Sequence, residues 1–564
     1  MTDYLWFKSY DEGVPRSLAP YSDQTLIDDV DEAERERPAA TMMIFKGRNI
    51  SFREANRASD ALAAALADQG VRKGDRVALI MPNTPNIIIS QFAVWKAGAV
   101  AVPVNPLFSD SEMIYALTEC DAKVAIVLTT FYQKIKNVQS STSLRCIIAT
   151  NVKDFLSPMV RLIFTLFMEK KGGHRAKVAA GDLSLTALIS RYAASARPPV
   201  RVSGDDDGLI LFSGGTTGVP KGVVLTHGAI RMNGLQIRAW FGKMLTRWQD
   251  TTLLMMPFFH VYGNVILMST CVVGRHPMAL VPNPRDFKDL FETIRKVKPS
   301  FFPGIATLFN GLLNHPDVRA GKVDFRSMKM CAAAAMPLLP ELKKNFEEIT
   351  GGKIVEAYGL TESGVLAMGP VFGLWKEGAV GLPTPDTIIR IVDIATGTKD
   401  MPTGEDGEII ARAPHLMKGY WRRPEATAEM LRDGWLYTGD VGHLDEDGYL
   451  FITSRKKELI KPSGHQVFPG EVEDVIMQHP ACLEVAVAGV PDPYQVEAVK
   501  AWLVLRPDAQ ATAEELQEHC RKTLASYKVP KFIEFRDDLP KSMVGKVLRR
   551  VLQEEEAGKR KTSG

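Results

Sequence analysis

A loop rich in glycine and threonine carries the clearest chemical signal in the sequence. It runs from Phe212 to Gly222 with the sequence FSGGTTGVPKG, and the apolar run 208–212 that leads into it predicts a strand. The glycines let successive backbone N–H groups converge on an anion, while the hydroxyls add donors and Lys221 adds a positive charge. No Gly-Lys-Ser or Gly-Lys-Thr closes the glycine run, so this is not the loop of P-loop NTPases. We predict a phosphate-binding loop, with a flexible hairpin as the alternative.

Further candidate residues follow this loop along the chain. His260 stands in an aromatic turn, PFFHVYG, where it would form the polar edge of an apolar slot, although a lone histidine is more often structural than catalytic. In the run VEAYGLTESG, Tyr358 offers a stacking face, Thr361 a hydroxyl, and Glu362 a hard anionic oxygen suited to Mg²⁺. Asp440 follows a predicted strand, and its carboxylate suits two vicinal hydroxyl groups as donors.

The segments around these residues alternate between strands and helices. Residues 76–81 predict a buried strand, 82–96 a helix and 97–104 a second strand. Strand, helix and strand at this spacing form a βαβ unit, which implies a parallel sheet covered by helices. The pattern repeats at 121–128 and after the glycine loop, so the fold class is α/β. From about residue 380, short strands alternate with Gly/Asp turns, which favours a small antiparallel, barrel-like subdomain.

Length and composition limit the class of protein. A chain of 564 residues predicts two or more domains, and 45% hydrophobic with 24% charged residues is typical of a soluble globular protein. The net charge of +3 gives no indication of nucleic-acid binding. The six cysteines lack metal-binding spacing, which indicates free thiols in a reducing compartment. Without a signal-peptide pattern or an apolar run of membrane length, we expect a cytoplasmic protein.

The segment 157–171, with the sequence SPMVRLIFTLFMEKK, departs from this pattern. It is strongly apolar and is followed closely by basic residues, namely Lys170, Lys171, Arg175 and Lys177. It is too short to span a bilayer, but it is long enough to lie in the interface with its basic end toward anionic headgroups. The alternative is an ordinary core helix, and the sequence does not decide between the two. Peripheral contact with the inner face of a membrane is therefore a hypothesis.

The motifs, in this order, resemble the acyl- and aryl-CoA synthetases of the adenylate-forming superfamily. They are the glycine loop, PFFH, YGLTE, YTGD, the run RKKELIK with the Ser-Gly pair that follows it, and PKSMVGK at 540–546. Each motif alone is moderately specific, whereas six in order are highly specific. The match covers roughly Trp6 to Arg550. The Gly214-Gly215 pair and the run VPNPRD at 281–286 resemble the long-chain fatty acid branch.

The resemblance implies a fold and a reaction. The fold is a large N-terminal domain of α/β sheets with the barrel-like subdomain over residues 1–453, a hinge at 454–458, and a smaller, mobile α+β domain over 459–564. The reaction is ATP-dependent activation of a fatty acid, of medium or long chain, to acyl-AMP, followed by transfer to coenzyme A with Mg²⁺ as cofactor. The alternatives are an aryl- or other small-acid CoA ligase and an acyl-AMP ligase that loads a separate carrier protein. The oligomeric state stays open, a homodimer included.

The resemblance also implies a set of residues that bind the nucleotide. Those expected on the phosphates of ATP are Ser213, Gly214, Gly215, Thr216, Thr217, Gly218 and Lys221. Those expected beside adenine are Tyr358, Gly359, Ala333, Ala334 and Ala335. Thr361 would contact the α-phosphate, Glu362 and Thr216 would serve Mg²⁺, and Asp440 and Arg455 would hold the ribose. Arg455 has an ordinary alternative as a salt-bridge partner on a solvated basic face.

Four further residues are implied in the chemistry and the domain motion. His260 would line the acyl pocket and Lys457 would be the pivot of the C-terminal domain. Gly464 would line the channel for the pantetheine arm, because the absence of a side chain admits a narrow group. Lys546 would engage the carboxylate and the α-phosphate, where two negative groups must meet and positioned positive charge lowers the barrier. A surface lysine is the alternative for Lys546.

Overall fold

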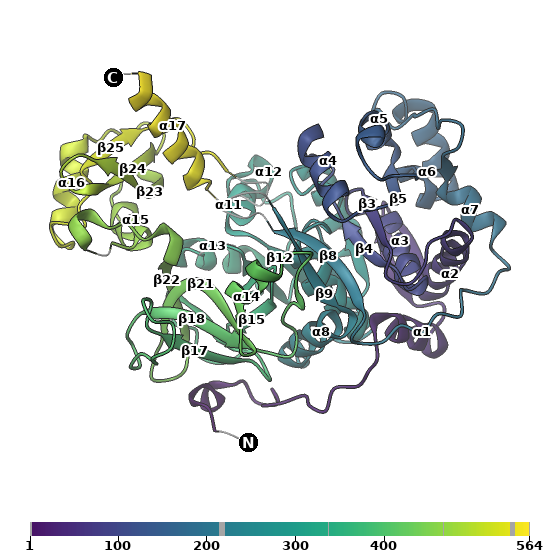
Figure 1. Ribbon diagram of the computed structural model, residues 1–564, viewed down its shortest axis with the longest axis horizontal. Helices are drawn as coiled ribbons and strands as arrows, with labels where there is room; N and C mark the ends of the chain where they lie inside the picture. Colours follow the sequence, from purple (N-terminus) through teal and green to yellow (C-terminus); the bar gives the residue numbers. More distant parts are fainter. Residues whose placement is uncertain (1–2, 214–219, 337, 466, 542–546, 563–564) are drawn as a thin grey trace.

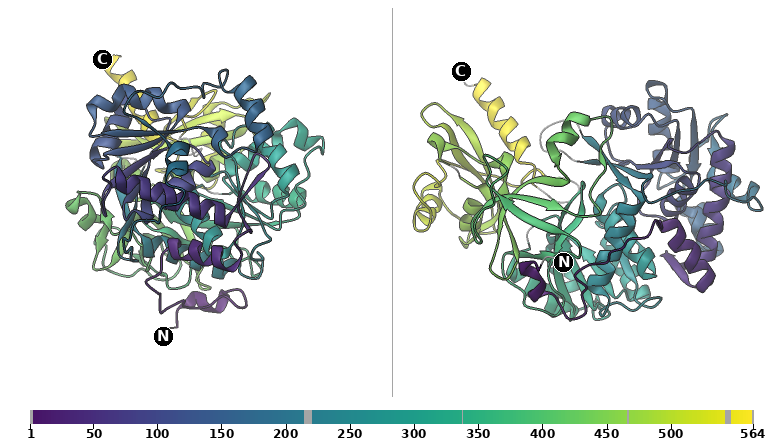
Figure 2. Two further views of the ribbon diagram at one scale, coloured as in Figure 1. Left: turned by 90° about the vertical axis from the view of Figure 1, so that its right-hand side faces the viewer. Right: turned by 60° about the horizontal axis from the view of Figure 1, so that its bottom comes forward.

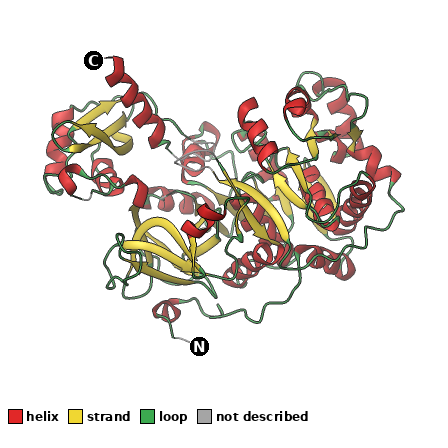
Figure 3. Cartoon of the chain, viewed as in Figure 1, coloured by secondary structure: helices red, strands yellow, loops and turns green. Residues whose placement is uncertain are grey.

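The computed structural model describes residues 3–213, 220–336, 338–465, 467–541 and 547–562 (Figure 1). Its strands form a 14-stranded, an eight-stranded and a three-stranded sheet. The first two sheets lie side by side in the N-terminal part of the chain, with helices on their outer faces (Figure 3). This arrangement confirms the predicted α/β class.

The eight-stranded sheet contains the predicted βαβ units. Its order is β19-β9-β8-β4-β3-β5-β6-β7, parallel from β8 to β7, with antiparallel β8–β9 and β9–β19 pairs. Its strands are β3 (Arg76–Ile80), β4 (Val100–Pro103), β5 (Val124–Leu128), β6 (Cys146–Thr150), β7 (Leu183–Ser184), β8 (Asp207–Ser213), β9 (Lys221–Thr226) and β19 (Gly419–Tyr420). Its helices are α2 (Phe52–Asp68), α3 (Pro85–Lys96), α4 (Asp110–Glu119), α5 (Thr129–Val138), α6 (Pro158–Ile163) and α7 (Leu185–Arg191).

Local sequence explains where these elements begin. The predicted helix from residue 82 begins at Pro85, because proline is suited to a first helical turn whose N–H groups have no partner in the helix. Ser109 caps α4 and forms a reciprocal pair with Glu112. All residues of β5 are buried, as expected of a parallel strand covered on both faces.

The parallel half of the 14-stranded sheet carries the segments with His260 and with Ala333, Ala334 and Ala335. Its strands are β1 (Thr41–Phe45), β2 (Arg48–Ser51), β10 (Thr252–Leu254), β11 (Met278–Leu280), β12 (Phe301–Gly304), β13 (Met330–Ala334) and β14 (Lys353–Leu360), with β2 antiparallel at the edge. Its helices are α1 (Leu26–Glu36), α8 (His227–Phe241), α9 (Ser269–Gly274), α10 (Phe287–Val297), α11 (Ala306–Asn314), α12 (Pro316–Arg319) and α13 (Pro340–Thr350). A π-helical turn, Tyr262–Met268, leads into α9.

The other half of this sheet is the antiparallel subdomain predicted from residue 380. Its strands are β15 (Gly364–Met368), β16 (Ala379–Pro383), β17 (Ile388–Val392), β18 (Gly407–Arg412), β20 (Leu431–Arg432), β21 (Trp435–Leu444) and β22 (Leu450–Arg455), with one helix, α14 (Pro424–Met430). The β15–β16 pair joins them to β14, so this subdomain continues the large sheet.

The residues after 459 build a separate sheet with its own apolar cores. The strands are β23 (Cys482–Asp492), β24 (Val496–Leu505) and β25 (Phe532–Phe535), and the helices are α15 (Pro469–Met477), α16 (Ala513–Arg521) and α17 (Arg549–Thr562). This α+β unit stands apart from the two large sheets in Figures 1 and 2. The boundaries at 453 and 459 and the mobility of the unit stay predictions.

Two expectations from composition can be compared with the structure. All six cysteines are free, five of them buried and Cys146 half-buried. Within the described part of the chain, no helix has both the length and the apolarity needed to cross a membrane.

Candidate active site

A tight β14–β15 hairpin presents three of the candidate residues. Tyr358 lies near the end of β14, and Thr361 and Glu362 form the turn before β15. A Cβ atom at Gly359 would lie 1.8 Å from the carbonyl oxygen of Gly364, so only glycine allows the two strands to approach this closely. The hairpin therefore holds an aromatic ring, a hydroxyl and a carboxylate within five consecutive residues.

Tyr358, Asp440 and Arg455 meet in one hydrogen-bonded group. Asp440 on β21 lies opposite Arg455 on β22, and the Arg455 Nε atom lies 2.8 Å from Asp440 Oδ1. The Tyr358 hydroxyl donates to Asp440 Oδ2 at 2.7 Å. Burial, together with the charge of Asp440, raises the pKa of Tyr358 well above its usual value, so the phenol stays protonated. The structure thus brings together one residue predicted beside adenine and two predicted on the ribose.

Glu362 is buried and accepts a hydrogen bond from a residue that the sequence reasoning missed. The Tyr420 hydroxyl donates to Glu362 Oε1 at 2.7 Å, and the Lys221 ammonium lies 4.9 Å from the centre of the Tyr420 ring. Tyr420 reaches this position because β19 pairs with β9, the strand that Lys221 begins. Burial raises the pKa of the Glu362 carboxyl. An aromatic side chain therefore connects the end of the glycine loop to the candidate metal ligand.

The glycine loop connects the two strands of a hairpin. Ser213 ends β8 and Lys221 begins β9, and the Ser213 hydroxyl donates to the Lys221 carbonyl at 3.3 Å. The predicted phosphate-binding residues Gly214, Gly215, Thr216, Thr217 and Gly218 lie outside the described residues, as does Lys546. Their proposed roles stay predictions from the sequence.

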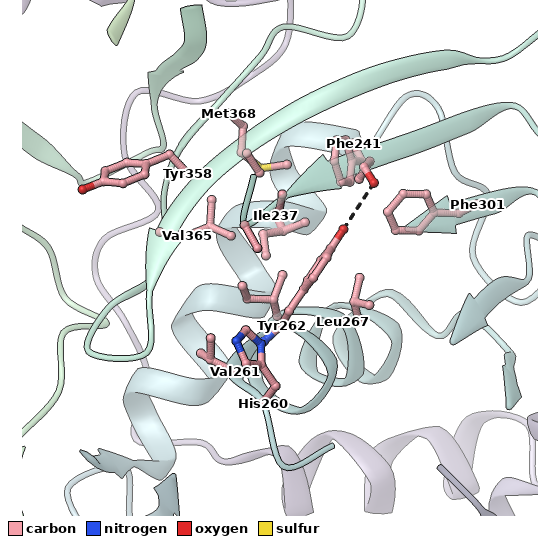
Figure 4. Close-up of a pocket in the computed structure, with 16 residues that line it drawn as sticks. Ile237, Phe241, His260, Val261, Tyr262, Leu267, Phe301, Tyr358, Val365 and Met368 are labelled. Carbon is pink, nitrogen blue, oxygen red and sulfur yellow. Dashed lines mark hydrogen bonds between the residues drawn. The ribbon is translucent and has the colours of Figure 1, made fainter. Parts of the chain in front are cut away.

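A narrow apolar cavity lies next to the hairpin (Figure 4). Five of the predicted residues line it, namely His260, Ala334, Ala335, Tyr358 and Gly359. Phe241 and Phe301 lie at one end and Tyr358 at the other. Aliphatic side chains of α8, the π-helical turn and β15 form most of the remaining wall, namely Ile237, Ile266, Leu267, Val365 and Met368. Ala333 does not line the cavity, because it is buried within β13 between its partners on β12 and β14.

His260 is held at the wall of this cavity as a neutral ring. Its Nδ1 atom accepts a hydrogen bond from the backbone N–H of Tyr262 at 3.2 Å. Burial lowers the pKa of His260 to about 4, so the imidazole is uncharged near neutral pH. An uncharged ring with Nδ1 occupied leaves Nε2 as its donor. This fits the predicted polar edge of an apolar slot and does not fit a general base that titrates near neutrality.

Three buried amide side chains fix the turn that carries His260, and the sequence reasoning missed them. Asn83 accepts from the Phe258 N–H at 3.1 Å and donates to the Met256 carbonyl at 2.8 Å. Asn264 donates to the Phe258 carbonyl at 2.8 Å and exchanges two further hydrogen bonds with Gln91, both 2.8 Å long. The sequence offered one signal for these residues, namely amide side chains within apolar runs. Such a side chain is expected to be buried, and a buried amide needs a hydrogen-bond partner.

Asn264→Leu is expected to lower the free energy of unfolding by about 1–3 kcal/mol, because it leaves the Gln91 amide and the Phe258 carbonyl buried without partners. Urea denaturation measures this effect. The double change Asn264→Leu with Gln91→Leu removes both members of the amide pair and is expected to recover part of the loss. A double variant as unstable as the sum of the two single variants would contradict the reciprocal pairing.

The segment 456–458, between the large sheets and the C-terminal unit, forms ion pairs with both. Lys456 forms an ion pair with the buried Glu408 of β18 at 2.7 Å. Glu458 forms an ion pair with Arg549 of α17 at 2.6 Å. Lys457 stands between them, exposed, in the short 3-10 turn Lys456–Glu458. Gly464 ends the next such turn, Pro462–Gly464, eight residues beyond Lys456 along the chain.

The described residues fit a magnesium ion that is held jointly with nucleotide phosphates. They contain no cluster of three or more His, Cys, Asp or Glu side chains able to hold a metal by themselves. Mg²⁺ is commonly bound through one or two carboxylates, with phosphate oxygens and water completing its shell. Glu362, buried and hydrogen-bonded by Tyr420, provides one such carboxylate.

Comparison with known proteins agrees with the motifs. The AMP-binding enzyme family model matches residues 30–421, and the AMP-binding enzyme C-terminal domain model matches residues 471–546. A long-chain-fatty-acid–CoA ligase of Bacillus subtilis (strain 168) is 38% identical over 560 residues, which cover 98% of each chain. A feruloyl-CoA synthase of Amycolatopsis sp is 31% identical over 519 residues, covering 91% of this chain and 96% of the relative.

A solved structure supports the same assignment. ATP-bound MatB from Rhodopseudomonas palustris is similar to this chain with a TM-score of 0.81 and 26% sequence identity, over 95% of this chain and 99% of that one. The resemblance predicted from the six motifs is confirmed. Because the first family model matches more than half of the chain and the Bacillus relative aligns along nearly all of it, the chain belongs to the AMP-binding enzyme family.

Proposed function

We propose that this chain is an ATP-dependent fatty acid–CoA ligase. It converts a medium- or long-chain fatty acid to acyl-AMP and then transfers the acyl group to coenzyme A, with release of pyrophosphate and AMP. The observation that carries the proposal is the apolar cavity beside Tyr358, with Asp440 and Arg455 hydrogen-bonded behind that ring. The curated relative from Bacillus subtilis bears the name of this reaction.

The nucleotide residues take the roles that the motifs predict. Tyr358, Gly359, Ala334 and Ala335 bind the adenine side, and Asp440 and Arg455 bind the ribose. Thr361 contacts the α-phosphate, and Lys221 with the glycine loop binds the pyrophosphate that leaves. Glu362 holds Mg²⁺, which when bound neutralises negative charge on the phosphates. Lys546 brings a further positive charge to the meeting point of carboxylate and α-phosphorus.

The segment 454–458 acts as the hinge between the two half-reactions. Lys456 is ion-paired to Glu408 of β18, and Glu458 is ion-paired to Arg549 of α17. A rotation about the backbone of Lys457, which lies between them, would therefore turn the C-terminal unit relative to the large sheets. Rotation would withdraw Lys546 from the acyl-AMP and bring Gly464 toward it for the attack of the thiol. Domain rotation of this kind commonly completes an active site for one step at a time.

The proposed substrate is tested by profiling acids with AMP release and thioester formation as readouts. Saturated acids from acetate to palmitate, together with 4-coumarate and benzoate, are each offered with ATP, Mg²⁺ and coenzyme A. We expect the highest kcat/KM at a chain of medium or greater length, because each buried methylene favours binding by about 0.8 kcal/mol. A maximum at an aryl acid would instead favour the alternative that the feruloyl-CoA synthase relative represents. Acyl-AMP that accumulates with coenzyme A present would favour a carrier-loading ligase.

The proposed location is the cytoplasm, with peripheral contact at the inner face of a membrane through residues 157–171. Long-chain acids partition into bilayers, so an enzyme that uses them benefits from a position at the lipid surface. The exposed apolar side chains of this segment support the proposal.

A further inference from the structure

The segment α6 and the π-helical turn that continues it, Phe164–Met168, expose an apolar face. Met159, Leu162, Ile163, Leu166 and Phe167 have the spacing i, i+3, i+4, i+7 and i+8, and Val160 and Met168 beside them are exposed as well. The exposed fractions of the first five are 74%, 60%, 49%, 67% and 72%, in that order. Single exposed apolar residues need no explanation, but a contiguous patch of this kind marks an interaction site. The core-helix alternative is therefore wrong for this segment.

Polar contacts at the C-terminal end of this segment hold it against the neighbouring residues. Glu169, immediately after the turn, is buried and forms an ion pair with Lys153 at 2.6 Å. Asn151 donates to Glu169 Oε1 at 3.2 Å and to the His174 carbonyl at 2.9 Å. The Phe164 ring packs edge-on against the His174 ring, with 5.3 Å between their centres. These contacts fix the C-terminal end of the segment against the rest of the protein.

The exposed charges of the segment itself are of one sign. Within residues 157–177 the exposed charged side chains are all basic, namely Arg161, Lys170, Lys171, Arg175 and Lys177. Glu169 is the one acidic residue of that range, and its charge is already paired by Lys153. Arg161 shares a hollow with Asp154, so the positive charge comes chiefly from Lys170, Lys171, Arg175 and Lys177. Apolar side chains next to such a basic cluster match an anionic bilayer surface, in which phosphates lie above acyl chains.

The geometry points to an anionic lipid bilayer as the occupant of this surface. We propose that Met159, Leu162, Ile163, Leu166 and Phe167 insert to the boundary between headgroups and acyl chains, while the five basic residues contact lipid phosphates. α6 lies toward the end of the molecule opposite the C-terminal sheet, so membrane contact leaves the C-terminal unit free to rotate (Figures 1 and 2). The proposed membrane insertion is inferred from the exposed apolar face and does not depend on the proposed function. Only its consequence, that the enzyme takes its fatty acid from the bilayer, rests on the proposed function.

Co-sedimentation of the full-length protein with vesicles tests the insertion. The vesicles are phosphatidylcholine alone or phosphatidylcholine with phosphatidylglycerol. We expect binding to the anionic vesicles that weakens with salt, and at least about tenfold weaker binding for the double change Leu166→Ser with Phe167→Ser. The matched control is Phe372→Ser with Leu374→Ser, because these two side chains are similarly exposed, at 56% and 65%, on another part of the surface. That control is expected to bind as the unchanged protein does.

A second pair of variants tests the charges. Lys170→Gln with Lys171→Gln is expected to weaken binding to anionic vesicles and to flatten its salt dependence, whereas Lys344→Gln with Lys353→Gln is expected to change neither. Folding of each variant is checked by circular dichroism and thermal unfolding, and its rate with octanoate in the absence of vesicles should also stay unchanged. The rate with oleate supplied in vesicles should fall in the Leu166/Phe167 variant.

Three results would overturn the proposal. The first is absence of binding, or equal binding by the unchanged protein and the Leu166/Phe167 variant. The second is an equal loss in the Phe372/Leu374 control. The third is a dimer in the absence of lipid that the Leu166/Phe167 variant converts to monomer, which would assign the face to a second copy of the chain. Failure of the proposed ligase reaction appears separately, as absence of thioester from any acid, and leaves the binding result intact.

Discussion

Glu362→Gln is expected to lower the rate of acid-dependent exchange between pyrophosphate and ATP by about 10²–10³-fold. The change keeps the shape of the side chain, and Tyr420 can still donate to it, but it removes the buried negative charge that we propose holds Mg²⁺. Because burial raises the pKa of this carboxyl, protons compete with Mg²⁺, and the Mg²⁺ concentration needed for half-maximal rate is expected to rise as the pH falls.

The matched control is Glu429→Gln on the exposed surface of α14, which removes the same charge away from the site. It should leave exchange within about twofold of the unchanged protein. Exchange by Glu362→Gln at the unchanged rate and with the same Mg²⁺ dependence would remove Glu362 from the proposed metal site.

Lys546→Ala is expected to reduce the same exchange reaction by about 10²–10³-fold while leaving the second half-reaction largely intact. Lys546 lies outside the described residues, so this prediction rests on the motif PKSMVGK and the family to which the chain belongs. In the first step a carboxylate approaches the α-phosphorus, and a positioned lysine offsets their repulsion. In the second step the thiol of coenzyme A attacks a carbonyl carbon, where that charge is not required.

The two steps are separated by supplying acyl-AMP directly and measuring thioester formation with coenzyme A. Lys522→Ala serves as control, because Lys522 is an exposed lysine of the same C-terminal unit. Pyrophosphate exchange near the unchanged rate would contradict the proposed role of Lys546, and an equal loss in both steps would indicate a structural role.

The local elements and the identity of the chemical groups follow from the sequence. The βαβ units and the antiparallel strands after residue 380 were predicted because apolar periodicity and turn residues act over short distances. The residues of the motif YGLTE are neighbours in sequence, and they lie on one hairpin, so they are neighbours in space as well. The two strands of this hairpin approach so closely that only glycine fits at position 359. Motif order was sufficient to predict the family.

The tertiary structure decided which distant side chains meet. Tyr420 reaches Glu362 because a two-residue strand pairs with β9, and such a short pairing leaves no periodic pattern. Asn83, Gln91 and Asn264 come from two segments far apart in the chain, and only burial makes their mutual pairing necessary.

The segment 157–171 shows the same division most directly. Its apolar residues and basic flank were evident in the sequence, but a core helix and an interfacial helix share the same pattern. The difference depends on whether another element covers the apolar face, and that is a property of the folded chain. In the structure these apolar side chains are exposed, whereas Glu169 near the end of the segment is buried and paired with Lys153. Composition along the chain determined what this segment can contact, and tertiary packing decided that it faces outward.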